Sequence, residues 1–198
     1  TVTGVQTCAL PICLSPLHVL VGTSGLSLTA VNGNLFLRLS SGGLTTSQVT
    51  KLMSAKNGAI VSLGADNGGV VVDQITQFDA DISNDQLEFV AGAGDITLSS
   101  TSALTAAAVS LRAANGNIVA PVTTTRVDTS ASNGLILLQA RQIGASANPL
   151  NINPGSGQLD VSSTNDDYLT IAHSFATGQF RQLTTTTGSK QLSLASGD

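Results

Sequence analysis

The chain has 198 residues, of which 41% are hydrophobic and only 10% are charged. This composition excludes an intrinsically disordered chain, and a net charge of −4 without a basic cluster excludes an electrostatic surface for nucleic acid. The aliphatic runs are too short for a membrane-spanning helix. Val, Ile, Leu and Thr dominate between frequent Gly, Ser and Asn residues, which favours short β-strands separated by turns.

The first thirteen residues, TVTGVQTCALPIC, contain both cysteines of the chain, Cys8 and Cys13. They do not resemble a signal peptide, because they contain no Lys or Arg, and beyond His18 the cysteines have no partner at metal-ligand spacing. Back-translation of Val2–Ile12 instead resembles a common sequencing adapter over eleven consecutive codons. We therefore predict that residues 1–13 are a non-native, adapter-derived segment and that the native, cysteine-free sequence begins near Leu14.

From Leu14 onward, short strands with alternating apolar residues recur after Gly or Asn turns, as in NGNLFLRL from Asn32 and NGLILLQA from Asn133. Alternation of this kind places one set of side chains inside and the other outside. The turn glycines lie at Gly33, Gly58, Gly94, Gly116, Gly134, Gly157 and Gly178, and if the long interval between Gly58 and Gly94 contains a further turn at Gly68 and Gly69, they recur on average about every 21 residues. Self-similarity at this period predicts a solenoid.

A longer internal match also indicates a repeat. The stretch SPLHVLVGTSGLSLTAVNG from Ser15 resembles NPLNINPGSGQLDVSSTND from Asn148, with each matched residue shifted by 133 positions. Six coils of about 22 residues would produce this shift. We interpret residues 14–198 as a β-helix repeat segment of a larger protein.

The predicted fold is all-β, a right-handed parallel β-helix of eight or nine coils with about 21 residues per coil. Inward Val, Ile and Leu side chains would stack from coil to coil, small residues would occupy the corners, and turn Asn residues would form hydrogen-bonded ladders. The pattern lacks the Leu and Asn ladder of leucine-rich repeats, the 3.6-residue period of helical repeats and the calcium-binding RTX nonapeptide. The alternative fold is a β-sandwich, which predicts antiparallel hairpins.

Few residues in the sequence are candidates for catalysis or metal binding. The densest acidic stretch is FDADISNDQLEF, in which Asp79 and Asp81 would share one face of a strand and could hold a hard cation. No Lys or Arg occurs between Lys56 and Arg112, so a local base for catalysis at this stretch is not expected. His18 and His173 are expected at the surface or in turns. We therefore expect no catalytic residue and no cofactor.

The repeat also resembles a known family. LSLTAVNGNLFLR, GDITLSS, NGNIVAP and especially RQIGASANPLNI resemble the central repeats of filamentous haemagglutinin-like adhesins, large exoproteins of Gram-negative bacteria that are often exported by two-partner secretion. An IG…NPL phrase commonly interrupts the β-helix in that family. It is matched here by Ile143, Gly144, Asn148, Pro149 and Leu150. The resemblance implies a protein located outside the cell or on the outer-membrane surface.

The expected function is structural. The chain would be a shaft segment of an adhesin, packed against flanking β-helix coils, with host or surface glycans and proteins contacted by the parent protein or weakly by the lateral faces of the segment. The alternatives are a fragment of a lyase-like, carbohydrate-active β-helix enzyme and a self-assembling matrix or fibre protein. The residues expected to shape the turns and repeats are Gly33, Gly58, Gly94, Gly116, Gly134, Gly144, Pro149 and Gly157.

Overall fold

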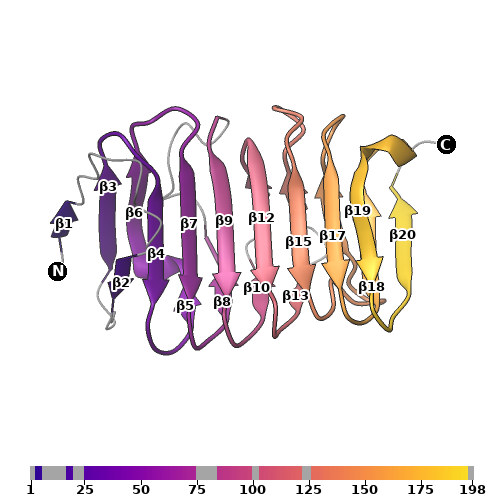
Figure 1. Ribbon diagram of the computed structural model, residues 1–198, viewed down its shortest axis with the longest axis horizontal. Helices are drawn as coiled ribbons and strands as arrows, with labels where there is room; N and C mark the ends of the chain where they lie inside the picture. Colours follow the sequence, from indigo (N-terminus) through magenta and orange to yellow (C-terminus); the bar gives the residue numbers. More distant parts are fainter. Residues whose placement is uncertain are drawn as a thin grey trace.

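The computed structural model describes residues 3–5, 17–19, 25–74, 84–99, 103–121 and 126–195. In this part of the chain, β-strands are joined by turns and by two short 3-10 helices, η1 (Thr46–Gln48) and η2 (Thr177–Gln179), and there is no α-helix. The strands lie side by side in an elongated rod, with the two ends of the chain at opposite ends (Figure 1). The described residues wind as a right-handed parallel solenoid of about 7 turns with about 23 residues per turn.

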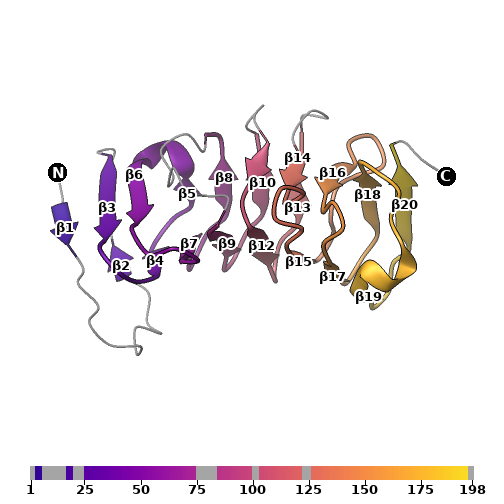
Figure 2. The same ribbon diagram turned by 90° about the horizontal axis from the view of Figure 1, so that it is seen from above.

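The longest face of the rod is an eight-stranded parallel sheet that extends along most of it (Figure 1). Its strands are β2 (Leu17–Val19), β4 (Leu35–Leu39), β7 (Ile60–Ala65), β9 (Gln86–Ala91), β12 (Ala108–Ala113), β15 (Ile136–Ala140), β17 (Leu159–Ser163) and β19 (Phe180–Thr185). We call this sheet the long face. In the view from above, its strands line one side of the rod and the remaining strands line the other (Figure 2).

The opposite side consists of shorter sheets. One contains β5 (Leu44–Thr45), β8 (Val70–Val72), β10 (Ile96–Leu98) and β13 (Ile118–Val119). Another contains β1 (Thr3–Val5), β3 (Leu26–Ala30) and β6 (Val49–Ser54). The last contains β11 (Leu104–Thr105), β14 (Arg126–Asp128), β16 (Leu150–Asn153), β18 (Asp167–Ile171) and β20 (Lys190–Leu194).

All strand pairs among the described residues are parallel, which confirms the predicted β-helix over the β-sandwich. Coil length varies around the mean because the connections differ. Ala108 pairs with Gln86, 22 residues earlier, whereas Ile136 pairs with Val109, 27 residues earlier. The longer coil includes the turn at 129–135 between β14 and β15.

Alternation along each strand builds the core. On the long face, successive coils place equivalent inward residues on top of one another, and the middle column contains Leu37, Leu63, Phe89, Leu111, Leu138 and Val161. Each of these side chains is buried, and together with inward residues of the other faces they form one continuous apolar cluster. Removal of this apolar surface from water is the main stabilising term of the fold.

Small residues occupy the corner where the long face ends, as the sequence predicts. The last inward position of these strands changes from Leu39 to Ala65, Ala91, Ala113 and Ala140 in successive coils. These alanines are almost completely buried. A larger side chain at this position would have to share the narrow end of the core with residues of the next face, so alanine permits the tight bend.

The 133-residue match does not correspond to a whole number of coils. Along the long face, six steps of register lead from Leu17 to Val161. Leu150, the residue matched to Leu17 by the sequence repeat, instead lies in β16 on the opposite side of the rod. The match therefore reports a shared strand-and-turn pattern, which occurs at more than one corner of the coil, and the interpretation as six coils is wrong.

The last coil differs from those in the middle. Most side chains of β19 and β20 are exposed, including Leu183, Leu192 and Leu194 at 38%, 37% and 44%. No helix in the described ranges is long and apolar enough to cross a membrane. The assignment of residues 1–13 to a non-native segment is not tested by the fold and stays a prediction.

Candidate functional site

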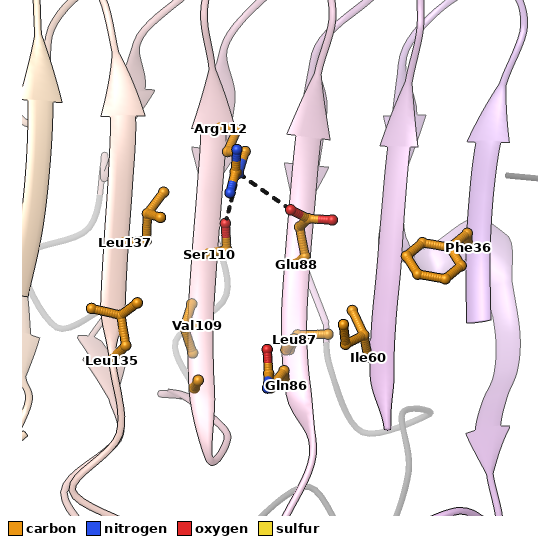
Figure 3. Close-up of a pocket in the computed structure, with 11 residues that line it drawn as sticks. Phe36, Ile60, Gln86, Leu87, Glu88, Val109, Ser110, Arg112, Leu135 and Leu137 are labelled. Carbon is orange, nitrogen blue, oxygen red and sulfur yellow. Dashed lines mark hydrogen bonds and ion pairs between the residues drawn. The ribbon is translucent and has the colours of Figure 1, made fainter. Parts of the chain in front are cut away.

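A groove of about 240 Å³ lies on the outer surface of the long face. It crosses strands β4, β7, β9, β12 and the start of β15, so that it runs across neighbouring coils of the rod. Glu88, Ser110 and Arg112 form its polar centre, while Phe36 lies toward one end and Leu137 toward the other (Figure 3). Residues of neighbouring coils form the groove together because parallel register aligns them in rows.

Glu88, which lines the groove, is the centre of a polar network that extends beyond it. Its Oε2 atom accepts a hydrogen bond from Ser62 Oγ at 2.5 Å and lies 3.7 Å from Arg38 Nη2. Its Oε1 atom lies 3.3 Å from Arg112 Nε. These four residues come from β4, β7, β9 and β12, so one carboxylate connects side chains of four successive coils.

Arg38 is the less exposed cation of the network, with 12% of its side chain exposed. Its Nη1 donates to Leu37 O and its Nη2 donates to Ser62 Oγ, both at 2.9 Å. Gly64, which pairs with Arg38 across the sheet, leaves room for this side chain, because a Cβ at Gly64 would lie 3.0 Å from Arg38 Cδ. Burial lowers the pKa of Arg38, while the carboxylates of Glu88 and Asp66 act to raise it.

Arg112 is the exposed cation of the network. Its side chain is 45% exposed, and its Nε donates to Ser110 Oγ at 3.1 Å next to Glu88 (Figure 3). Glu88 thus lies between two guanidinium groups and accepts a hydrogen bond from one hydroxyl group. The Oε2 atom of Glu88 accepts from Ser62 and its Oε1 atom faces the guanidinium of Arg112, so the carboxyl group is engaged by residues of other coils. The arrangement is suited to connecting coils.

The sequence interpretation that the acidic stretch lacks a basic neighbour is wrong for Glu88. That interpretation counted distance along the chain, whereas the solenoid places Arg38 and Arg112 from other coils beside this carboxylate. Arg38 is the residue that sequence reasoning missed. The coil period would have revealed it, because Ser62 and Glu88 are directly paired and Arg38 lies one further coil away.

The other acidic residues are placed differently. Asp79 and Asp81 lie outside the described residues, so the cation site stays a prediction. Asp85 is buried, and its Oδ1 accepts a hydrogen bond from the backbone N–H of Ala59 at 2.8 Å. This bond connects Asp85 to the residue that precedes β7. Among the described residues, no group of three or more His, Cys, Asp or Glu side chains is arranged to hold a metal ion.

The two histidines lie at the surface. His18 Nδ1 is 2.9 Å from Asp66 Oδ2, and both side chains are substantially exposed. His173 is exposed in the segment between β18 and β19. Their exposure agrees with the expectation that both histidines lie at the surface or in turns.

The turn glycines lie at two corners of the coil. Gly33, Gly58, Gly134 and Gly157 precede strands of the long face, and Gly94 and Gly116 follow such strands. The mean spacing of about 21 residues in the sequence was therefore calculated from glycines at two different corners of the coil. The remaining two residues of the set, Gly144 and Pro149, lie between β15 and β16.

The IG…NPL phrase forms a compact loop between β15 and β16. Gly144 has a φ of +66°, and the backbone groups of Ala145 and Asn148 exchange two hydrogen bonds of 3.0 Å. On either side of the loop, the side chains of Ile143 and Leu150 are completely buried in the core. Gly144 thus adopts the left-handed conformation that the turn requires, and the buried side chains of Ile143 and Leu150 hold the loop against the core.

The described chain is thus a parallel β-solenoid compatible with a β-helix repeat protein. Comparisons with protein-family models, with curated proteins and with solved structures found no match.

Proposed function

We propose that this chain is a shaft segment of a secreted or surface-anchored adhesin of the filamentous haemagglutinin type, located outside a Gram-negative cell. The single observation that carries the proposal is the uninterrupted stack of parallel coils around one apolar core. In such a solenoid each coil is stabilised by its neighbours, so the length of the rod can increase without any change in local structure. A rod of this kind holds a distal binding region away from a surface.

The use of the polar residues supports a structural function. Glu88 and Arg38 form contacts between coils on the outer face, and Asp85 bonds to the backbone of an adjacent coil. A carbohydrate-active enzyme would instead need a carboxylate or base that is accessible to a substrate. Arg112, with its half-exposed guanidinium, is the group in the groove that would make a weak lateral contact with an anionic glycan or protein.

A pulling experiment tests the mechanical function. The chain would be placed between two marker domains and stretched along the rod, and successive coils should detach in repeated steps. A coil of about 23 residues corresponds to roughly 80 Å of extended chain, which sets the expected step size. Extension at negligible force, without steps, would show that the stack cannot act as a shaft.

A display experiment tests the reach of the rod. Cells would present a binding tag through this chain, and control cells would present the same tag through a Gly/Ser linker of equal residue number. The rod should maintain adhesion when a thick surface layer surrounds the cell, because it is stiff, whereas the linker behaves as a random coil. Equal loss of adhesion in both strains would count against the proposal.

An activity assay separates the shaft from the enzyme alternative. The folded chain would be incubated with pectin and other polyanionic glycans, with and without Ca²⁺. We expect no depolymerisation. Turnover that disappears in an Asp79→Asn, Asp81→Asn variant would instead favour the lyase-like alternative.

A further inference from the structure

Five Asn–Gly dipeptides occur in the sequence, all within the described residues. They are Asn32–Gly33, Asn57–Gly58, Asn67–Gly68, Asn115–Gly116 and Asn133–Gly134. In such a pair the backbone nitrogen of Gly can attack the side-chain amide of Asn, because glycine has no Cβ to obstruct the approach. The same chemistry is thus available five times in one molecule, and only the surroundings differ.

Three of the glycines are pressed against the backbone of a neighbouring coil. A Cβ at Gly68 would lie 2.3 Å from Gly42 O, a Cβ at Gly116 would lie 2.0 Å from Gly94 O, and a Cβ at Gly134 would lie 1.6 Å from Ala107 O. At these positions the backbone has no space to move toward a side chain. A reaction there first requires the coil to open locally.

Hydrogen bonds also hold these three pairs. Asn67 Nδ2 donates to Ser40 O at 2.9 Å, and Asn115 Nδ2 donates to Gly92 O at 3.0 Å. Asn133 Oδ1 accepts from Ser156 N–H at 2.9 Å. The attacking nitrogens of two pairs are occupied as well, because Gly116 N–H donates to Ala113 O and Gly134 N–H donates to Thr129 O.

The other two glycines are open. A Cβ at Gly33 or Gly58 would meet nothing within 4 Å. At Asn32–Gly33 the following backbone is still fixed, since Gly33 O accepts a hydrogen bond from Ser54 Oγ at 2.6 Å. Asn57 and Gly58 are both exposed, and the side chain of Asn57 makes no hydrogen bond with any residue that the structure describes.

We propose that Asn57–Gly58, in the corner between β6 and β7, is a site of spontaneous deamidation and isoaspartate formation in the folded protein. The backbone nitrogen of Gly58 bonds to Cγ of Asn57, the bond from Cγ to the amide nitrogen breaks, and ammonia leaves with the proton of Gly58. Water then opens the resulting five-membered imide at either carbonyl and gives aspartate or isoaspartate. No oxidant or reductant is needed.

The modification changes the surface of the rod at one corner. It replaces a neutral amide by a carboxylate beside the exposed Lys56, and isoaspartate also lengthens the backbone by one carbon. Gly58, at a φ of +72°, has the conformational freedom to accommodate this extension without disturbing the buried Ala59. If the protein lies outside the cell, as proposed above, aspartate and isoaspartate would accumulate at this corner as the molecule ages.

Peptide mapping tests the proposal. The full chain would be incubated at mildly alkaline pH and body temperature in water enriched in oxygen-18, and deamidation at each Asn–Gly pair would be followed by mass spectrometry. Asn57 should react about tenfold faster than Asn115 and Asn133, and Asn32 should react at an intermediate rate. In concentrated urea the five rates should converge, because local opening no longer limits the reaction.

Two variants provide the matched comparison. Asn57→Gln should remove most of the charge change that accumulates in the folded chain, because the longer side chain cannot close a five-membered ring. Asn115→Gln should leave that charge change unaltered. If Asn115 or Asn133 reacts as fast as Asn57 in the folded chain, the assignment of Asn57–Gly58 as the preferred site is wrong.

Discussion

At the residue scale, acidic side chains satisfy backbone groups at the corners of the coils. Asp73 Oδ1 accepts from Ser47 N–H at 2.9 Å, Asp95 Oδ1 accepts from Asn117 N–H at 2.7 Å, and Asp167 Oδ1 accepts from Ile143 N–H at 3.0 Å. Strand pairing is interrupted at corners, and a buried N–H without a partner would be costly. These three aspartates thus serve as hydrogen-bond acceptors for backbone N–H groups of the chain itself.

The first prediction concerns pH. Burial acts to raise the pKa of Asp73, but hydrogen bonds from Thr46 and Ser47 outweigh this effect and lower it from the ordinary value of 3.8. Asp73 therefore stabilises the fold fully above that pH, and this contribution is lost as the pH falls through the lowered folded-state pKa. Urea denaturation as a function of pH should show this loss in the native chain and not in Asp73→Asn.

The second prediction concerns the network in the groove. Glu88→Gln removes the charge that compensates the partly buried Arg38 and should lower the free energy of unfolding by about 1–2 kcal/mol. Arg112→Gln is the matched control, because Arg112 is half exposed and its ion pair should contribute less than about 1 kcal/mol. Urea midpoints of the two variants would be compared, and an equal or larger effect of the Arg112 variant would contradict the prediction.

At the scale of the element, the corner after the long face depends on close backbone contact between coils. Gly116 follows β12 and lies against Gly94, which follows β9 in the preceding coil. The two residues are equivalent in successive coils, so the requirement for glycine repeats with the fold. Strand propensity cannot specify this corner, because the constraint comes from the neighbouring coil.

The third prediction tests this corner. Gly116→Ala places a Cβ 2.0 Å from Gly94 O and should destabilise the protein by roughly 1–3 kcal/mol, because the two coils must move apart. Gly33→Ala is the matched control, since a Cβ there meets nothing within 4 Å, and a stability change below about 1 kcal/mol is expected. Thermal unfolding monitored by circular dichroism would measure both, and equal shifts would contradict the prediction.

At the scale of the whole molecule, stability should vary along the rod. Each coil contacts only its two neighbours, so opening can begin where the contacts are fewest. The inward residues of β12 are almost completely buried, whereas β19 and β20 expose most of their side chains. The rod is thus expected to open from the last coil toward the middle.

The fourth prediction follows from this gradient. In hydrogen exchange measured by mass spectrometry, amides of β9 and β12 should be the slowest to exchange among the described strands, and amides of β20 should exchange much faster. As long as the chain is a monomer, the amides of β20 should exchange faster than those of β12. Uniform protection along the chain would show that the rod opens in a single cooperative step.

Much of the architecture could be predicted because alternation and turn residues are local. The buried Leu35, Leu37 and Leu39 alternate with the partly exposed Phe36 and Arg38, and the row of leucines at every second position indicates which side of the strand is buried. The small residues at the corners could be predicted for the same reason, since Ala65 and Ala91 end their strands. These features require knowledge of only one coil.

The sequence by itself thus determined that the chain forms a charge-poor parallel solenoid with one apolar core. Only the tertiary structure decided which residues meet across coils. Arg38 and Glu88 are 50 positions apart in the sequence, and the register between coils brings them together. The packing between coils also makes Asn57–Gly58 different from Asn115–Gly116, although the two dipeptides are identical: Gly58 is open, whereas Gly116 lies against the neighbouring coil. Contacts between coils depend on the length of every coil between the two residues. Because coil length varies with each turn, a local sequence pattern does not specify which residues meet.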